Sequence, residues 1–205
     1  MKTLIATKLG MISALTPDTG ELVAVTLLKT EPGVVTQLKS TEKDGYNAVQ
    51  VGWGKGKPSK SLAGHLKPSK AEPKLIREVR VDELSEEMSV GTKVTADVFE
   101  VGDNVSVTAK SKGKGWAGTI KRHNFHRQRK THGGKGDTRK VGSIGSMYPQ
   151  HIRKGKKMAG RMGHTNVTVS GLKVALVEAE KGVIGITGAV PGPRRGLVVI
   201  KGVSK

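Results

Sequence analysis

The sequence contains no cysteine among its 205 residues. Disulfide scaffolds, thiolate zinc sites, iron–sulfur clusters and thiol nucleophiles are therefore excluded. Aromatic residues make up only 3% of the chain, so large side chains that anchor a core are scarce. No apolar run approaches the roughly 20 residues that a membrane-spanning helix needs, and the N-terminal apolar stretch is too short for a signal peptide. We therefore expect a cytoplasmic protein with no membrane partner.

Acidic side chains are almost missing from the middle of the chain. Lys and Arg total 36 against 17 Asp and Glu, which gives a formal net charge of +19. Residues 1–109 hold 14 basic and 14 acidic side chains, whereas residues 110–163 hold 16 basic side chains and Asp137 as the only acid. Such a localised positive field favours a polyanionic partner.

On both sides of this basic segment the chain is rich in short apolar and β-branched runs. They occur at residues 22–28, 34–38, 46–53, 75–81, 94–101, 105–108, 167–169, 174–177, 183–187 and 197–200. Many short strands separated by turn residues predict a mainly β protein built on a small closed barrel. We expect residues 1–109 and 164–205 to form this barrel domain, with a Lys-, Gly- and Pro-rich excursion near residues 53–74.

The basic segment, residues 110–163, is not expected to fold on its own. Ordering a backbone costs conformational entropy at every residue, and this segment offers only ten sizeable apolar side chains to offset it. Because β runs resume after residue 163, the segment is an insertion whose two ends are fixed by the barrel. An anchored basic loop of this kind indicates a structured RNA partner.

Two patterns suggest chemistry at first sight. Gly113-Lys114-Gly115-Trp116-Ala117-Gly118 matches the dinucleotide-binding fingerprint, but the basic stretch that follows is no amphipathic helix of a nucleotide-binding fold. His123, His126 and His132 have only Asp137 as a neighbouring carboxylate, and the surrounding cations oppose a divalent ion. We therefore expect no catalytic residue, no metal, no cofactor and no small-molecule substrate.

The side chains expected to contact RNA fall into three kinds. Lys and Arg neutralise phosphates, aromatic and His rings stack on bases, and the many glycines let the backbone approach closely. Trp116 and Ile120 would alternatively pack a short helix on the barrel, and Phe125 and Tyr148 fit local packing or base stacking equally well. The candidate RNA-binding residues are Lys112, Lys114, Trp116, Lys121, Arg122, His123, Phe125, His126, Arg127, Arg129, Lys130, His132, Lys135, Arg139, Lys140, Tyr148, Arg153, Lys154, Lys156, Lys157 and Arg161.

Six short motifs follow one another along the chain: KLGM at residues 8–11, KGKGWAGTIKR at 112–122, THG at 131–133, GSIG at 142–145, KGKKMAGRMG at 154–163 and GAVPG at 188–192. This ordered set resembles the universal large-subunit ribosomal protein L-three family in its bacterial form. The family often has His-Arg-x-Pro before GSIG, and here Thr138-Arg139-Lys140-Val141 stands there. Gln150 follows Pro149 instead of preceding the Pro-Gly of the loop tip, so the glutamine methylation of some relatives is not expected here.

The resemblance implies a six-stranded barrel like that of translation-factor second domains, with a long irregular extension inserted in it. It implies that residues 125–153 form the extension, with a tip near 143–150 and a basic root at 112–122 and 154–163. Family members bind the 3′ region of large-subunit ribosomal RNA, send the extension towards the peptidyl transferase centre and help to initiate subunit assembly. Their neighbours include the fourteenth and nineteenth large-subunit proteins.

Two other functions remain as alternatives. A general nucleic-acid chaperone or DNA-compacting protein would bind without preference for one ribosomal RNA region. An RNA-modifying enzyme that uses the glycine-rich loop would carry a bound small cofactor when purified.

Overall fold

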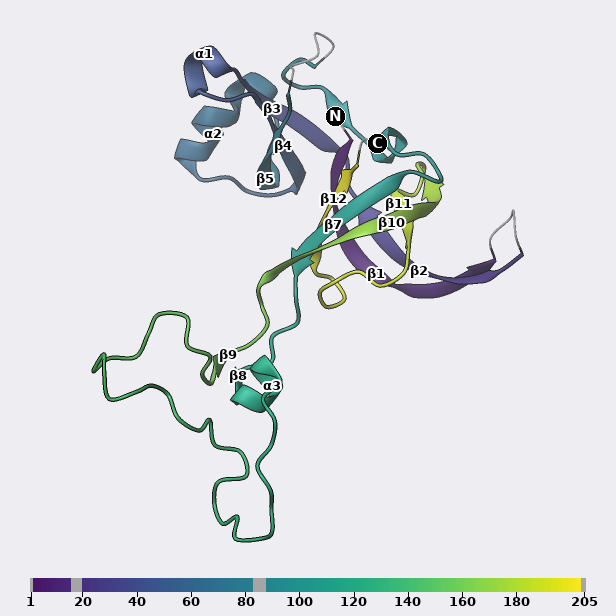
Figure 1. Ribbon diagram of the computed structural model, residues 1–205. Helices are drawn as coiled ribbons and strands as arrows, with labels where there is room; N and C mark the ends of the chain where they lie inside the picture. The colour runs from purple at the N-terminus through teal and green to yellow at the C-terminus, as the bar shows by residue number, and fades with distance from the viewer. Residues whose placement is uncertain (1, 16–19, 83–87, 204–205) are drawn as a thin grey trace. The chain divides into compact units, whose positions relative to one another are not determined.

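The computed structural model describes residues 2–15, 20–82 and 88–203 (Figure 1). The chain forms two compact units: Met1–Lys110 together with Asn166–Lys205, and Ser111–Thr165. Within the described ranges, no helix has the length and apolar character required to cross a membrane.

Six strands of the first unit close into a barrel, in the order β1, β12, β7, β10, β11 and β2 (Figure 1). All six neighbouring pairs are antiparallel. The prediction of a mainly β protein with a six-stranded barrel is thus confirmed. The strands are β1 (Thr3–Leu15), β2 (Leu22–Thr30), β7 (Asn104–Lys110), β10 (Asn166–Glu178), β11 (Val183–Thr187) and β12 (Leu197–Gly202).

The strand β1 was not among the predicted β runs. Its register against β2 shifts between Lys8 and Gly10, where a β-bulge interrupts the alternation of apolar and polar side chains. Beyond the bulge both faces of the strand are largely exposed, so Met11 and Leu15 follow no buried-face pattern. The alternation of apolar and polar side chains that predicts a strand is therefore absent from the half of β1 that follows the bulge.

Four further strands of the first unit form a separate sheet in the order β5, β4, β3 and β6. The sequence predicts these runs as part of the barrel domain; they form a second sheet within the same compact unit as the barrel. The predicted excursion near residues 53–74 begins in β4, contains helical turns and ends in β5. These elements are β3 (Gly33–Lys39), α1 (Thr41–Asp44), β4 (Ala48–Lys55), α2 (Lys60–Leu66), η1 (Lys67–Ser69), β5 (Pro73–Arg80), β6 (Lys93–Val94) and η2 (Ala96–Val98).

One hydrophobic core serves both sheets of the first unit. Leu28 and Ile200 of the barrel belong to the same buried cluster as Val35 and Val51 of the four-stranded sheet. Phe99, which follows η2, is only 2% exposed and is among the largest side chains in this cluster. The burial of apolar surface that stabilises the barrel therefore also holds the second sheet.

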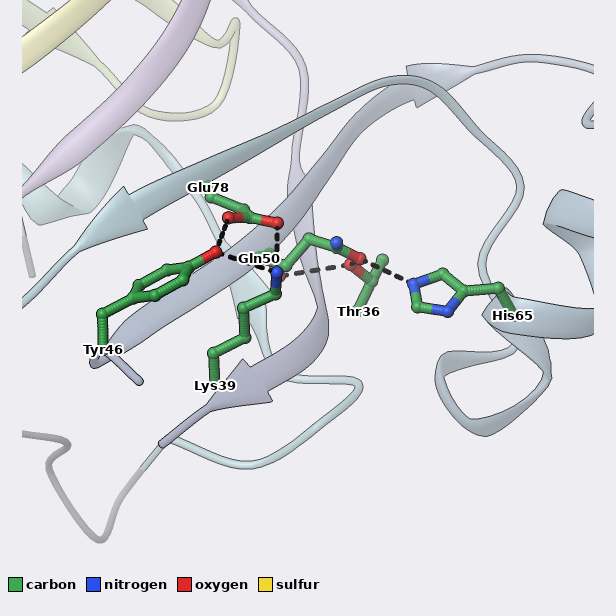
Figure 2. Close-up of polar contacts among 6 residues, drawn as sticks. All are labelled: Thr36, Lys39, Tyr46, Gln50, His65 and Glu78. Carbon is green, nitrogen blue, oxygen red and sulfur yellow. Dashed lines mark hydrogen bonds and ion pairs between the residues drawn. The ribbon is translucent and has the colours of Figure 1, made fainter. Parts of the chain in front are cut away.

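A polar cluster links β3 and β5 of the four-stranded sheet with Tyr46, which lies just before β4 (Figure 2). The Lys39 ammonium lies 2.9 Å from the Glu78 carboxylate and donates to the Tyr46 hydroxyl at 3.0 Å. The Tyr46 hydroxyl in turn donates to Glu78 at 2.8 Å. Hydrogen bonds from Lys39 and then Tyr46 lower the pKa of the Glu78 carboxyl, and the bond to Glu78 raises the pKa of Lys39.

The Glu78 cluster predicts a loss of stability in acid. Because the pKa of Glu78 lies below its usual 4.5 in the folded chain, its stabilisation is present above that pH and is lost as the pH falls through the folded pKa. The Glu78→Gln variant should show a shallower fall of unfolding free energy as the pH is lowered below the usual carboxyl pKa of 4.5. Urea titrations at several pH values measure this slope. The exposed Glu72→Gln is the control, and a Glu78→Gln slope equal to that of the unsubstituted chain would contradict the prediction.

Candidate nucleic-acid interface

The two ends of the second unit pair with each other. Lys110 is opposite Asn166 in the barrel ladder, and the Ser111 amide then donates to the Thr165 carbonyl at 2.9 Å. Pairing continues through two short strands, which close the basic insertion with a hydrogen-bonded root. These strands are β8 (Trp116–Ala117) and β9 (Gly160–Arg161).

Glycine is required where the two root segments approach most closely. The Lys114 amide donates to the Met162 carbonyl, and the Met162 amide donates to the Gly115 carbonyl, both at 2.9 Å. Gly163 has a φ of +75°, and a Cβ at this position would collide with the Lys112 carbonyl oxygen. Only a residue without a side chain fits there, so the pairing of the root segments depends on Gly163.

A short helix, α3 (Thr119–His123), holds the root from one side. The Arg122 guanidinium donates to the Met158 carbonyl at 3.0 Å, and the His123 Nε2 lies 3.2 Å from the same oxygen. His123 is half-buried and its ring lies 6.2 Å from that of Phe125, at a 46° tilt. Arg122 and His123 therefore make carbonyl contacts that the sequence did not reveal, and Phe125 makes a local ring contact of the kind that was one of its two alternatives.

Beyond the root, residues 124–157 contain no helix or strand and form what we call the extension loop (Figure 1). Its internal hydrogen bonds are local turns, such as the Lys140 amide to the Asp137 carbonyl at 3.0 Å. One longer bond joins the Gln128 amide to the Thr138 carbonyl at 3.1 Å. Most of the loop's backbone polar groups are thus available to water or to a partner.

Positive charge dominates this second unit. It contains fifteen Lys and Arg side chains and one carboxylate, that of Asp137. Asp137 pairs with Lys140 at 2.6 Å, and this hydrogen bond raises the pKa of Lys140. The other cations of the unit have no acid within it to neutralise them.

All the candidate RNA-binding residues except His123 and Phe125 are exposed. Trp116 is 79% exposed and Tyr148 is 86% exposed, so neither ring is packed. The alternative in which Trp116 belongs to a packed helix is wrong, because the residue lies in β8, before α3 begins. Ile120, its supposed partner, is half-buried on that helix.

The glycine-rich stretch at residues 113–118 is not built like a dinucleotide-binding turn. It contains the two-residue strand β8 and leads into the five-residue helix α3, which ends on Lys121, Arg122 and His123. A dinucleotide-binding turn needs a long strand before it and an amphipathic helix after it. No cluster of three or more His, Asp or Glu side chains suited to a metal occurs in the part of the chain that the structure describes.

Comparison with known proteins gives a consistent result. Residues 78–188 match the family model described as Ribosomal protein L3. The chain is 47% identical over 204 residues to the large ribosomal subunit protein uL3 of Heliobacterium modesticaldum, with 98% of this chain and 96% of that protein covered. It is 43% identical over 209 residues to that of Bifidobacterium longum (100% and 97% covered). The Syntrophus aciditrophicus protein of that name is 42% identical over 205 residues (98% and 93%).

The close approach at Gly163 predicts that its replacement opens the root. Gly163→Ala should speed hydrogen exchange at the Lys114 and Met162 amides, because the added Cβ pushes the two segments apart. Gly155→Ala is the matched control, since Gly155 has a similar φ of +81° but no atom within 4 Å of the added Cβ. Site-resolved exchange by NMR compares the two variants. Equal protection of these amides in both would contradict the proposed role of Gly163.

Proposed function

The chain belongs to the ribosomal protein L3 family, and on that premise we propose that it is a structural constituent of the large ribosomal subunit that binds large-subunit ribosomal RNA. The observation that carries this proposal is the match over nearly the whole chain to relatives named as large-subunit proteins. Its role is binding and not chemistry.

The charge of the second unit supports RNA as the partner. Fifteen cations with one carboxylate, which is already paired with Lys140, attract a chain of phosphates and release its condensed counterions. We assign phosphate contacts to the exposed Lys and Arg residues of the root and the extension loop. Clusters such as Lys154, Lys156 and Lys157 concentrate this charge where the loop returns to the root.

Exposed rings supply a second kind of contact. Trp116 and Tyr148 leave most of their surface to solvent, which is costly for large apolar groups unless a partner covers it. Stacking on a base contributes about 1–3 kcal/mol per ring. We therefore assign base stacking to Trp116 and Tyr148, with His126 as a further exposed candidate. Phe125, half-buried beside His123, is better suited to stiffening the start of the loop.

The finer features of the role follow from the family resemblance. The barrel corresponds to that of translation-factor second domains and binds near the 3′ region of the large ribosomal RNA. The extension loop runs towards the peptidyl transferase centre, and the protein binds early, so that it helps to initiate subunit assembly. The fourteenth and nineteenth large-subunit proteins are its neighbours.

Crosslinking in cells, followed by sequencing of the attached RNA, tests the proposed function. We expect the signal to concentrate in large-subunit ribosomal RNA, near its 3′ region. A signal spread evenly over messenger, transfer and ribosomal RNA, or over DNA, would instead support a general nucleic-acid chaperone or compacting protein.

Replacing Lys154, Lys156 and Lys157 by Gln tests the phosphate contacts at the end of the extension loop. The slope of log affinity against log salt concentration should flatten by up to about 0.9 for each phosphate that the variant no longer neutralises. Filter binding of the full chain to large-subunit ribosomal RNA over a salt series measures the slope. Replacing the exposed Lys29, Lys43 and Lys93 by Gln is the control with equal charge. An unchanged slope in the first variant would mean that these three lysines of the extension loop face solvent.

A further inference from the structure

We propose a further RNA-binding surface, on the first unit but separate from its barrel strands and from the extension loop. It consists of six lysines around helix α2 and recognises the phosphate backbone of structured RNA. This inference rests on the proposed function for the identity of its partner. The lysines of this α2 surface are Lys55, Lys57, Lys60, Lys67, Lys70 and Lys74.

The charge of this segment differs from that of the chain around it. Residues 55–74 hold six lysines and a single acid, Glu72. The rest of residues 1–109 holds eight basic and thirteen acidic side chains, so the neutral total of this region hides a separation of charge. All six lysines are exposed. The α2 surface is therefore a positive patch on an otherwise acidic part of the chain.

The ends of two strands bring together lysines that are distant in sequence. Lys55, the last residue of β4, pairs with Pro73 of β5, and the Gly56 amide donates to the Glu72 carbonyl at 2.8 Å. A Cβ on Gly56 would lie 2.7 Å from the Lys74 Cα, so glycine permits the close approach of the two segments. Lys55 and Lys74 consequently lie at the same end of the sheet.

A capping hydrogen bond at its start and a buried residue at its end fix helix α2. The Ser59 hydroxyl accepts a hydrogen bond from the Leu62 amide at 3.4 Å, and Leu66 is only 2% exposed. The buried Ser69 donates to the Leu66 carbonyl at 2.9 Å. Lys70 then adopts a left-handed φ of +51°, which ends the helical turns. The backbone that carries Lys60, Lys67 and Lys70 is thus ordered by packing and capping.

A buried amide fastens the same helix to the sheet (Figure 2). The Gln50 side-chain oxygen accepts a hydrogen bond from the Thr36 hydroxyl at 2.8 Å, and it lies 3.2 Å from the His65 Nε2. Because a carboxamide oxygen only accepts, the His65 Nε2 carries the proton in this contact. Gln50 is 8% exposed whereas His65 is exposed, so the contact is partly shielded from water. The lysines of α2 are therefore presented on a rigid support, which lowers the entropy cost of binding.

The character of the surface favours a phosphate backbone over a protein or a lipid membrane. None of the large exposed apolar side chains of the described chain lies within residues 55–74. Protein interfaces are depleted of Lys and use aromatic or apolar anchors in their cores. A membrane-bound helix inserts an apolar face, whereas Leu66 of α2 is buried in the protein. Exposed lysines on an ordered backbone match the contacts that position a protein on nucleic acid.

Acetylation footprinting of the full chain tests this surface directly. The protein, free and bound to large-subunit ribosomal RNA, is treated with an amine-reactive acetylating reagent, and each lysine is quantified by mass spectrometry. The six lysines should react several-fold more slowly in the complex, whereas Lys29, Lys43 and Lys93 should keep their rates. Equal rates for the six lysines in both states would overturn the inference.

The same experiment separates this inference from the proposed function. Protection of Lys154, Lys156 and Lys157 without protection of the α2 surface leaves the proposed function standing and removes the second surface. Protection of the α2 surface without protection of Lys154, Lys156 and Lys157 supports the second surface and contradicts RNA contacts of these lysines of the extension loop. Protection of the α2 surface in assembled subunits but not by ribosomal RNA alone would identify a protein partner and overturn RNA as its ligand.

A variant of the α2 surface gives an independent measurement. Replacing Lys60, Lys67 and Lys70 by Gln should flatten the salt dependence of ribosomal RNA binding by about 2–3 units if all three contact phosphates. The triple replacement of Lys29, Lys43 and Lys93 by Gln should leave the slope unchanged. Thermal unfolding checks that the exposed replacements leave the fold intact. A slope equal to that of the unsubstituted chain would exclude these phosphate contacts.

Discussion

The repulsion among uncompensated cations in the second unit is the constraint on which the rest of the structure depends. Fifteen Lys and Arg side chains share one carboxylate there, and Lys140 already occupies it. A segment of this composition cannot collapse onto an apolar core, so it forms a short hydrogen-bonded root and an irregular loop. The barrel supplies what the loop lacks, because β7 and β10 hold its two ends in register at Lys110 and Asn166.

Much of the barrel was predictable because its signal is local. Runs such as residues 105–108 and 183–187 alternate or are β-branched, and they became β7 and β11. The sequence did not indicate that the runs at 34–38 and 75–81 belong to a separate sheet. Alternation reports which face of a strand is buried, but it does not report which strands are neighbours. Strands of both sheets bury the same kinds of side chain in one shared core. Composition therefore does not distinguish strands of the barrel from strands of the four-stranded sheet.

The candidate site was predictable to the extent that it depends on charge. Lys and Arg residues such as Lys154 and Arg127 are exposed, as a phosphate-binding role requires, although their contacts with RNA stay predictions. His123 contacts a carbonyl, and Gly163 approaches a backbone segment, about 35–50 positions away in the sequence. A local sequence pattern therefore does not predict either contact. The Lys-rich excursion near residues 53–74 was predicted as a segment but not as a binding surface, because thirteen acids elsewhere in residues 1–109 cancel its charge in the regional sum.

The hydrogen-bonded root has a consequence for the thermodynamics of assembly. A chain tethered at both ends samples far fewer configurations than a free tail of equal length, because loop closure has already removed much of its freedom. The Ser111–Thr165 and Lys114–Met162 bonds shorten the free part of the insertion to about the extension loop itself. When the barrel folds and the root pairs, the insertion loses conformational entropy before RNA binds. Docking of the loop on RNA therefore costs less conformational entropy than docking of a free tail would.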